Sequence, residues 1–210
     1  MRQLYDYFRS SAAYRVRIAL HLKALPYEAI AVSLLDKMQQ SSDYIARNPQ
    51  GLVPTMIEEG AVLTQSLAIC EYLDEKYPEN PLLPSDVLDR AHVRSLAQSI
   101  ACDIHPLNNL RVLRYLEDEL GIQAEQKNAW YRHWIDVGFI ALEQQLQSTH
   151  GLYCFGDAVT LADVCLVPQV YNARRFNCQL DGFPIITAIT QQCLSLPAFN
   201  RTSPESYSQS

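Results

Sequence analysis

The spacing of hydrophobic residues changes partway along the chain. Alternation typical of β-strands occurs in four short segments, at residues 3–8, 27–32, 55–58 and 61–63. Apolar residues at helical spacing predict three helices in the same region, one beginning after residue 10, a short one at 42–47 and one at 66–77. The predicted order, β-α-β and then β-β-α, is typical of a small mixed sheet with helices on its faces.

A proline-rich stretch at 78–86 resembles an inter-domain linker, and no strand pattern recurs beyond it. Helical spacing predicts five helices there, at about 87–104, 107–120, 124–148, 160–175 and 184–195. Thr160 and Asp163 form a variant of the capping box at the start of the fourth of these helices.

We therefore predict a chain of the α/β plus all-α class. A mixed α/β domain covers residues 1–80, an all-helical domain covers 87–201, and a flexible, serine-rich tail covers 202–210.

The composition excludes several classes of protein. A chain of 210 residues, 48% of them hydrophobic, can bury a substantial core, and no apolar run approaches the length of a membrane span. The net charge of −6 argues against general binding to nucleic acid or to a membrane surface. The first strand pattern begins at residue 3 and leaves no room for a secretory signal, so we expect a cytoplasmic protein. The six cysteines contain no C-x-x-C pair, so we expect reduced thiols and no metal site.

The junction between the first predicted strand and the first helix is a candidate binding site for a negatively charged group. Ser10 and Ser11 stand where the helix begins, and serine is a preferred N-cap residue. Backbone N–H groups, two hydroxyls and the positive end of the helix dipole would meet at this point. Such a junction can stabilise an anion, a carboxylate or a thiolate, although a plain helix cap needs the same residues.

Two further segments are suited to a small anionic peptide. A cis Val53–Pro54 bond would leave the Val53 backbone open to pairing with an extended ligand, whereas trans is the commoner isomer and the sequence does not decide between them. Gln65 and Ser66 stand at another helix start, where the serine can cap the helix or hold a carboxylate.

The order and spacing of these motifs resemble those of the cytosolic glutathione transferases, and in particular of their zeta class, the family of maleylacetoacetate and maleylpyruvate isomerases. The resemblance covers roughly residues 3 to 200. Its motifs are Ser10-Ser11-x-x-x-Arg15-Val16-Arg17-Ile18-Ala19-Leu20, Asn48-Pro49-x-x-x-Val53-Pro54, Gln65-Ser66-Leu67-Ala68-Ile69, Pro106-Leu107-x-Asn109-Leu110, Gly156-Asp157-x-Val159-Thr160-Leu161-Ala162-Asp163-x-Cys165-Leu166-Val167-Pro168-Gln169-Val170 and Asn172-Ala173-x-Arg175-Phe176.

This resemblance implies a thioredoxin-like, glutathione-binding domain followed by a helical, substrate-binding domain. Ser10 and Ser11 would lie at the sulfur of glutathione, with Ser11 donating a hydrogen bond to the thiolate. Val53 would pair with the cysteinyl backbone of glutathione, and Gln65 with Ser66 would hold its γ-glutamyl end. The other positions that match glutathione contacts of the family are Ala12, Arg15, Gln39, Pro54, His105, Asn109 and Arg111.

Two of these assignments have simple alternatives. A histidine just before a proline, as His105 is, also serves as a local cap or as a packed ring. Tyr5 and Tyr7 are alternative donors to a thiolate, but their place in the first predicted strand favours packing, so Ser11 is preferred.

The resemblance also implies a reaction. A glutathione thiolate would add to a maleyl double bond, the resulting single bond would rotate, and elimination would release the trans acid. The site must hold a thiolate near neutral pH, against a free thiol pKa of about 8.5. It must also hold the carboxylates of a small dicarboxylic oxo acid, for which we expect Arg15 and Arg175, with Arg111 and Arg174 as second choices. The family further implies a homodimer.

Two departures from the family pattern affect the substrate. Ala12 stands where isomerases of the family commonly have cysteine, so chemistry through a cysteine at that position is excluded, and Tyr14 stands where tryptophan or histidine is usual. The segment Cys102-Asp103-Ile104-His105-Pro106 is reminiscent of the maleylpyruvate branch. The alternatives are a zeta-class transferase acting on α-halo acids and a non-catalytic, glutathione-transferase-like binding module.

Overall fold

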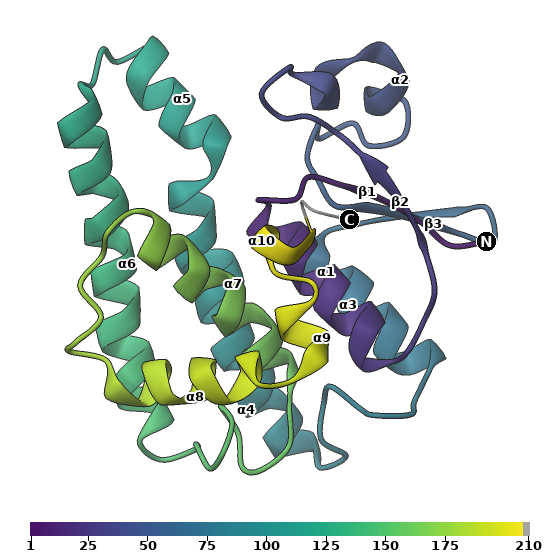
Figure 1. Cartoon of the computed structure of the whole chain (residues 1–210), viewed down its shortest axis with the longest axis vertical. Coiled ribbons are helices and arrows are strands. Elements are labelled where there is room, and N and C mark those ends of the chain that lie inside the picture. Colours follow the sequence, from purple (N-terminus) through teal and green to yellow (C-terminus); the bar gives the residue numbers. More distant parts are fainter. Residues whose placement is uncertain (208–210) are drawn as a thin grey trace. The chain divides into compact units, whose positions relative to one another are not determined.

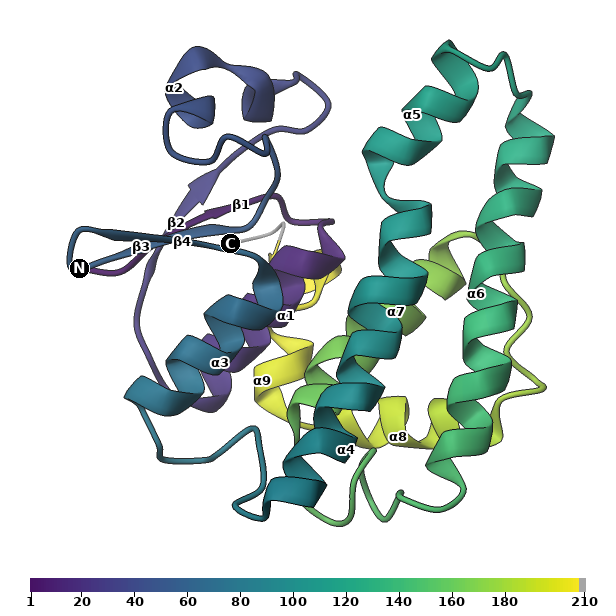
Figure 2. The ribbon, with the colours of Figure 1, turned by 180° about the vertical axis from the view of Figure 1, so that it is seen from behind.

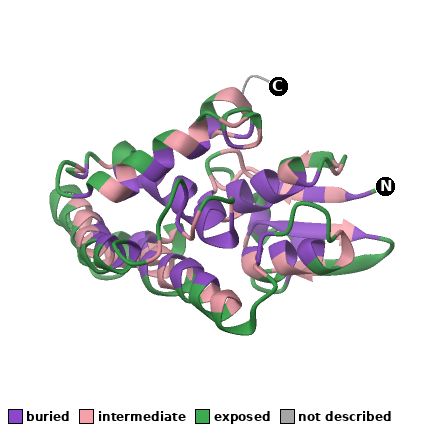
Figure 3. Cartoon of the chain, turned by 90° about the horizontal axis from the view of Figure 1, so that it is seen from below, coloured by how far each residue is buried: buried purple, intermediate pink, exposed green. Residues whose placement is uncertain are grey.

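The computed structural model describes residues 1–207 of the chain, which form two compact units. The first unit comprises Met1–Leu82 together with the C-terminal segment that begins at Leu196, and the second comprises Leu83–Ser195. Figure 3 shows that exposed residues gather on the outer sides of the helices of each unit.

The first unit is built on a four-stranded sheet with the order β2-β1-β3-β4. Its strands are β1 (Gln3–Asp6), β2 (Glu28–Ala31), β3 (Thr55–Glu58) and β4 (Ala61–Thr64). β1 pairs in parallel with β2 and antiparallel with β3, and β3 pairs antiparallel with β4. The parallel pair requires a crossover, which the first helix supplies.

The helices of the first part of this unit are α1 (Ser11–Leu22), the 3₁₀ turn η1 (Met38–Gln40), α2 (Ser42–Ile45) and α3 (Ser66–Lys76). α1 and α3 lie side by side on one face of the sheet, and α2 lies on the opposite side (Figures 1 and 2). Leu4 and Met56 from the sheet and Ile69 and Leu73 from α3 are fully buried, so this face carries the core of the unit.

The second unit is built from helices and also contains one isolated β-bridge, between His150 and Gly156. Its elements are α4 (Val87–Gln98), a π-helical turn η2 (Ser99–Ile104), a 3₁₀ turn η3 (His105–Asn108), α5 (Leu110–Asp118), α6 (Ala124–Leu146), α7 (Leu161–Arg175) and α8 (Pro184–Leu194) (Figure 1). α7 packs against α4 and α8 and is buried along most of its length. The predicted capping box starts it, because the Asp163 carboxylate accepts from both the N–H and the hydroxyl of Thr160, at 2.8 and 2.9 Å.

The predicted α/β plus all-α class is confirmed, but the division of the chain differs from the predicted one at its C-terminal end. The chain leaves the helical unit after Ser195, and α9 (Pro197–Asn200) and α10 (Pro204–Tyr207) belong to the first unit. Thr202 is fully buried, so residues 202–207 do not behave as the expected flexible tail; 208–210 lie outside the described residues. The C-terminal segment joins the first unit through buried polar contacts with residues distant in sequence, and no local sequence pattern reveals such contacts.

Three further findings concern the described residues as a set. All six cysteines are free, and five of them are buried, with Cys102 exposed. Within residues 1–207, no helix is both long and apolar enough to cross a membrane. In the same range, no group of three or more histidine, cysteine or acidic side chains is arranged to hold a metal ion.

Candidate functional site

The start of α1 is capped as the sequence predicts. Ser10 has an extended backbone conformation, and its hydroxyl accepts a hydrogen bond from the N–H of Ala13 at 3.2 Å. A tight turn precedes it, closed by the Ser10 N–H, which donates to the carbonyl of Tyr7 at 2.8 Å. Ser11 is the first residue of the helix and is 4% exposed, and Ala12 is half-buried. Ser10 therefore caps α1, and the backbone N–H groups and the dipole at this helix start have the properties expected of an anion site.

Arg15 lies one helical turn beyond Ser11 and joins two helix starts. It is 1% exposed, and its Nη1 donates to the hydroxyl of Ser66, the first residue of α3, at 3.2 Å. Its Nε and Nη2 have no hydrogen-bond partner among the described residues. Because the guanidinium is buried, the geometry favours an indirect role, in which Arg15 orients Ser66 and places positive charge beneath the site.

Gln65 precedes α3 in an unusual backbone conformation, with φ +68° and ψ 116°. This lies in the region that favours glycine, and a residue held there costs on the order of 1–3 kcal/mol. Its side chain is exposed, and its Nε2 donates to Oε1 of Gln50 at 2.7 Å. Strain of this kind gathers at ligand sites, which is consistent with the prediction for Gln65 and Ser66.

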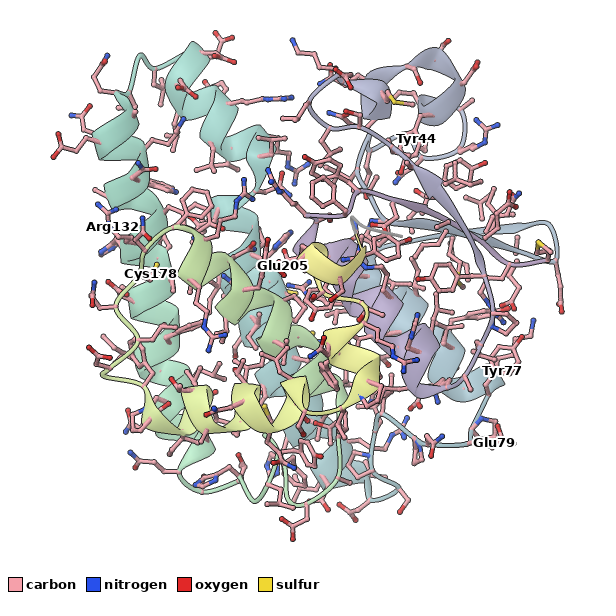
Figure 4. The ribbon with its side chains drawn as sticks, in the orientation of Figure 1. Tyr44, Tyr77, Glu79, Arg132, Cys178 and Glu205 are labelled. Atoms are coloured by element: carbon pink, nitrogen blue, oxygen red, sulfur yellow. The ribbon has the colours of Figure 1, made fainter. Side chains whose placement is uncertain are left out.

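The Val53–Pro54 peptide bond is cis. The loop just before it is held by two side chains, because Tyr44 and Asn48 each donate to the carbonyl of Leu52, at 2.7 and 2.8 Å. Figure 4 shows Tyr44 in the part of the first unit that carries α2. Burial raises the pKa of Tyr44, so its hydroxyl stays a donor at neutral pH. No residue within 1–207 hydrogen-bonds to the backbone N–H or C=O of Val53, whose side chain is buried against Tyr44.

Gln39 lies beneath the same loop. It belongs to η1 and is 6% exposed, and its Oε1 has no partner within the described residues. Gly51 has φ +61°, and a Cβ there would lie 3.1 Å from the Gln39 carbonyl oxygen, so the two segments are in close contact. The Gln39 backbone therefore lies against Gly51, in the segment that leads into Val53.

Tyr131 of α6 contacts η3 and the residue that follows the predicted Arg175. Asn108 of η3 donates to the carbonyl of Tyr131 at 3.0 Å. The ring of Tyr131 stacks on Phe176 with centroids 3.6 Å apart, and the guanidinium carbon of Arg175 lies 5.4 Å from the centroid of the Phe176 ring. Arg175 is the last residue of α7 and is exposed. The Tyr131–Phe176 stack and the Asn108 hydrogen bond therefore connect the end of α7, where Arg175 lies, to η3, which contains His105.

The remaining candidates flank η3. His105 is half-buried in that turn, and Asn109 caps α5 by accepting from the N–H of Arg111 at 3.1 Å. The side chains of Arg111 and Arg174 are exposed. Asn109 therefore has a structural role that accounts for its presence, whereas the two arginines remain open to a ligand.

The predicted residues thus form two groups, one in each unit. Sequence reasoning missed the contribution of Tyr44, whose hydroxyl also lies 2.9 Å from that of Thr55 and fixes the Val53 loop. It also did not single out Arg9, an exposed cation just before the cap of α1, with its guanidinium carbon 4.9 Å from the centroid of the Phe8 ring. The signal for Arg9 was its position, since a cation beside a helix start adds to the attraction for an anion.

Comparison with known proteins places these features in context. Residues 4–81 match the family described as "Glutathione S-transferase, N-terminal domain". A "Probable maleylacetoacetate isomerase" of Vibrio cholerae is 51% identical over 204 residues, which cover 96% of this chain and 95% of that protein.

Two solved structures are similar over nearly the whole chain. One is the holo structure of a maleylpyruvate isomerase, described as a bacterial zeta-class glutathione S-transferase, with a TM-score of 0.94, 46% identity and coverage of 97% of each chain. The other is a maleylacetoacetate isomerase of Methylobacterium extorquens AM1 with bound malonate and GSH, with a TM-score of 0.95, 39% identity and the same coverage.

Proposed function

Since the chain belongs to the zeta class of the glutathione transferase family, we propose that it is a glutathione-dependent cis–trans isomerase of a maleyl-type oxo acid. The product would be the fumaryl isomer of maleylacetoacetate or maleylpyruvate. The similar proteins include both maleylacetoacetate isomerases and maleylpyruvate isomerases. The observation that carries the proposal is the α1 start, where Ser10 and Ser11 lie one turn before a buried arginine that lacks a carboxylate partner among the described residues.

The residues of the first unit suit glutathione. The unpaired backbone groups of Val53 match the needs of an extended peptide, which pairs with a strand edge through its main chain. Ser66 and the backbone at the start of α3 offer donors to a carboxylate, and Arg15 orients the Ser66 hydroxyl. Gln39 has a buried amide oxygen without a partner in the described part of the chain, which an ammonium or N–H group of the ligand could satisfy.

Bound glutathione supplies a thiolate that adds to the maleyl double bond, permits rotation about the resulting single bond, and leaves by elimination. The start of α1 lowers the pKa of that thiol, because the helix dipole and a donated hydrogen bond from Ser11 both favour the anion. In the second unit, the exposed guanidinium of Arg175 can bind a substrate carboxylate in bidentate fashion. Arg9 offers a second exposed cation at the thiolate site itself.

The test is turnover of maleylpyruvate and of maleylacetoacetate, each with and without glutathione. Glutathione-dependent isomerisation that falls in Arg175→Ala, with the KM for the acid raised more than that for glutathione, would support the proposal, and the faster substrate would identify the physiological one. Turnover of dichloroacetate but of neither maleyl acid would favour the α-halo acid transferase. Failure to bind glutathione would favour a non-catalytic module.

Family membership also supports a cytoplasmic homodimer that binds neither nucleic acid nor membranes. The net charge of −6 agrees with the lack of nucleic-acid binding. Light scattering of the purified protein would measure the mass directly, and a value of one chain, 23.9 kDa, would contradict the dimer.

A further inference from the structure

One buried guanidinium joins three segments of the first unit. Arg17, which is 0% exposed, donates through Nη1 to both carboxylate oxygens of Asp6, at 2.9 and 2.8 Å. Its Nη2 donates to the carbonyl of Phe8 at 3.0 Å, and its Nε donates to the carbonyl of Thr202 at 3.1 Å. The ring of Tyr207 lies against it, with its centroid 4.3 Å from the guanidinium carbon. We call these five residues the Arg17 cluster.

The Arg17 cluster acts on the turn that leads into α1. Asp6 is the last residue of β1, and Phe8 lies inside the turn that the Ser10 N–H closes on Tyr7. Side chains of a helix lean toward its N-terminus, so Arg17 reaches back from the second turn of α1 over this segment. The strand end and the turn carbonyl are therefore fixed to the same helix that begins with Ser11.

The third anchor is distant in sequence. Thr202 and Tyr207 belong to the C-terminal segment of the unit, and the Tyr14 hydroxyl of α1 donates to the carbonyl of Phe199 there at 2.7 Å. Figures 1 and 4 show α10, on which Glu205 is labelled, next to α1. Because Tyr14 is 1% exposed and bound to this segment, its departure from the family pattern concerns the docking of the segment.

A second buried ion pair in the same unit shows that such pairs need not affect the turn. Lys23 Nζ lies 2.8 Å from the Asp74 carboxylate and donates to the carbonyls of Tyr77, Glu79 and Asn80. This pair fixes the end of α3 and the segment that follows it.

We propose that the Arg17 cluster sets the position of Ser10 and Ser11, so that Arg17 is a positioning residue and the C-terminal segment supports the glutathione site. The inference rests on the proposed function only in assigning the sulfur of glutathione to the start of α1. A shift of the turn by a fraction of an ångström would move the Ser11 hydroxyl and the first N–H groups of α1 away from the thiolate, where alignment decides their effect.

The test compares Arg17→Lys with Lys23→Met. Lysine keeps the charge but cannot donate to Asp6, Phe8 and Thr202 in the fixed fork of a guanidinium. The two readouts are the Kd for glutathione, by calorimetry, and the pKa of the bound thiol, from the ultraviolet absorbance of the thiolate. We expect Arg17→Lys to weaken binding about tenfold or more and to move the thiol pKa up toward about 8.5. Lys23→Met is expected to lower the melting temperature and to change neither readout.

Equal behaviour of the two variants would overturn the inference, since Arg17 would then be structural only. If Arg17→Lys does not fold, Tyr207→Leu replaces it, because that variant keeps every hydrogen bond of Arg17 and removes only the ring against it. An unchanged Kd and thiol pKa in Tyr207→Leu would then count against the inference. The Kd for glutathione and the thiol pKa can both be measured without turnover. A wild-type protein that binds glutathione but isomerises neither acid would therefore contradict the proposed function and leave the inference about Arg17 intact.

Discussion

At the residue scale, two arginines on one helix show how packing gives one residue type two roles. Arg17 has a partner for each of its guanidinium nitrogens. Arg15, two residues earlier, is also buried, but among residues 1–207 it donates only to Ser66. A buried donor without a partner costs on the order of 1–3 kcal/mol, and a protein keeps such a group where a ligand uses the charge.

The two arginines should therefore respond in opposite ways to substitution by methionine. Arg17→Met leaves Asp6 buried without its cation and should cost about 3–5 kcal/mol of unfolding free energy. Arg15→Met removes a cation that has no carboxylate partner in the described part of the chain, so it should leave stability unchanged or raised while binding of glutathione weakens. Urea denaturation and calorimetry measure the two effects. A loss of stability in Arg15→Met as large as in Arg17→Met would contradict the assignment.

Substitutions of Ser11 and of Ser10 should separate an effect on the reaction rate from an effect on the capping of α1. Ser11→Ala removes the proposed donor to the glutathione thiolate. A hydrogen bond to a charged group contributes about 1.5–3 kcal/mol, so isomerisation should slow about tenfold to a hundredfold. Ser10→Ala removes the cap of α1 and should cost about 1 kcal/mol of stability. Steady-state rates and thermal melts distinguish the two. If Ser10→Ala slowed the reaction more than Ser11→Ala, the roles would be reversed.

At the element scale, the predicted helix at 87–104 is interrupted where the site begins. α4 gives way to the π-helical turn η2 and then to η3, which brings His105 and Asn108 toward α6. Pro106 explains part of the change, because it lacks an N–H and restricts the residue before it. The rest comes from α6, where Gly138 leaves room for Ile104, the last residue of η2.

Gly138→Ala tests this contact. The new Cβ would lie 2.3 Å from both Cγ1 and Cδ1 of Ile104, so overpacking should cost about 1–3 kcal/mol, partly offset by the higher helix propensity of alanine. Adding Ile104→Ala removes both clashing atoms and should make the cost of the glycine substitution disappear in a double-mutant cycle. Gly182→Ala is the matched control, since its Cβ would meet nothing within 4 Å. Equal melting temperatures for Gly138→Ala and the control would rule the contact out as a constraint.

At the scale of the whole molecule, buried tyrosines make stability depend on alkaline pH. Burial raises the pKa of Tyr44, Tyr131 and Tyr207 above the ordinary 10.0, and the Asp6 carboxylate adds to this at Tyr207. The folded state thus keeps protons that the unfolded chain loses. Their contribution is fully present below about pH 10 and is lost as the pH rises through the folded-state values.

We therefore expect the unfolding free energy to fall steeply above about pH 10, with tyrosinate absorbance appearing together with unfolding. Tyr131→Phe keeps the ring that stacks on Phe176 and removes the ionisable group, so it should flatten the alkaline decline. Complete titration of all tyrosines near pH 10 in a protein that remains folded, by circular dichroism, would be the contrary result.

The sequence by itself determined the class of the fold and most of its elements. Strand and helix patterns are local, since alternation and helical spacing record which face of each segment is buried. The four strands and the starts of α1, α3 and α7 could therefore be predicted within a few residues. Ser10, Ser11, Gln65 and Ser66 were also identified from sequence, because capping residues and turns have short-range signatures.

Tertiary structure alone decided what depends on residues distant in sequence. The C-terminal segment joins the first unit because Arg17 and Tyr14 bind carbonyls 185 residues away, and no periodicity records such a contact. Burial likewise separated Arg15, which lies buried against Ser66, from the exposed Arg175, although both were predicted to bind substrate. A charged side chain has the same local signature whether it is solvated or buried, and only the packing around it determines which groups it can reach.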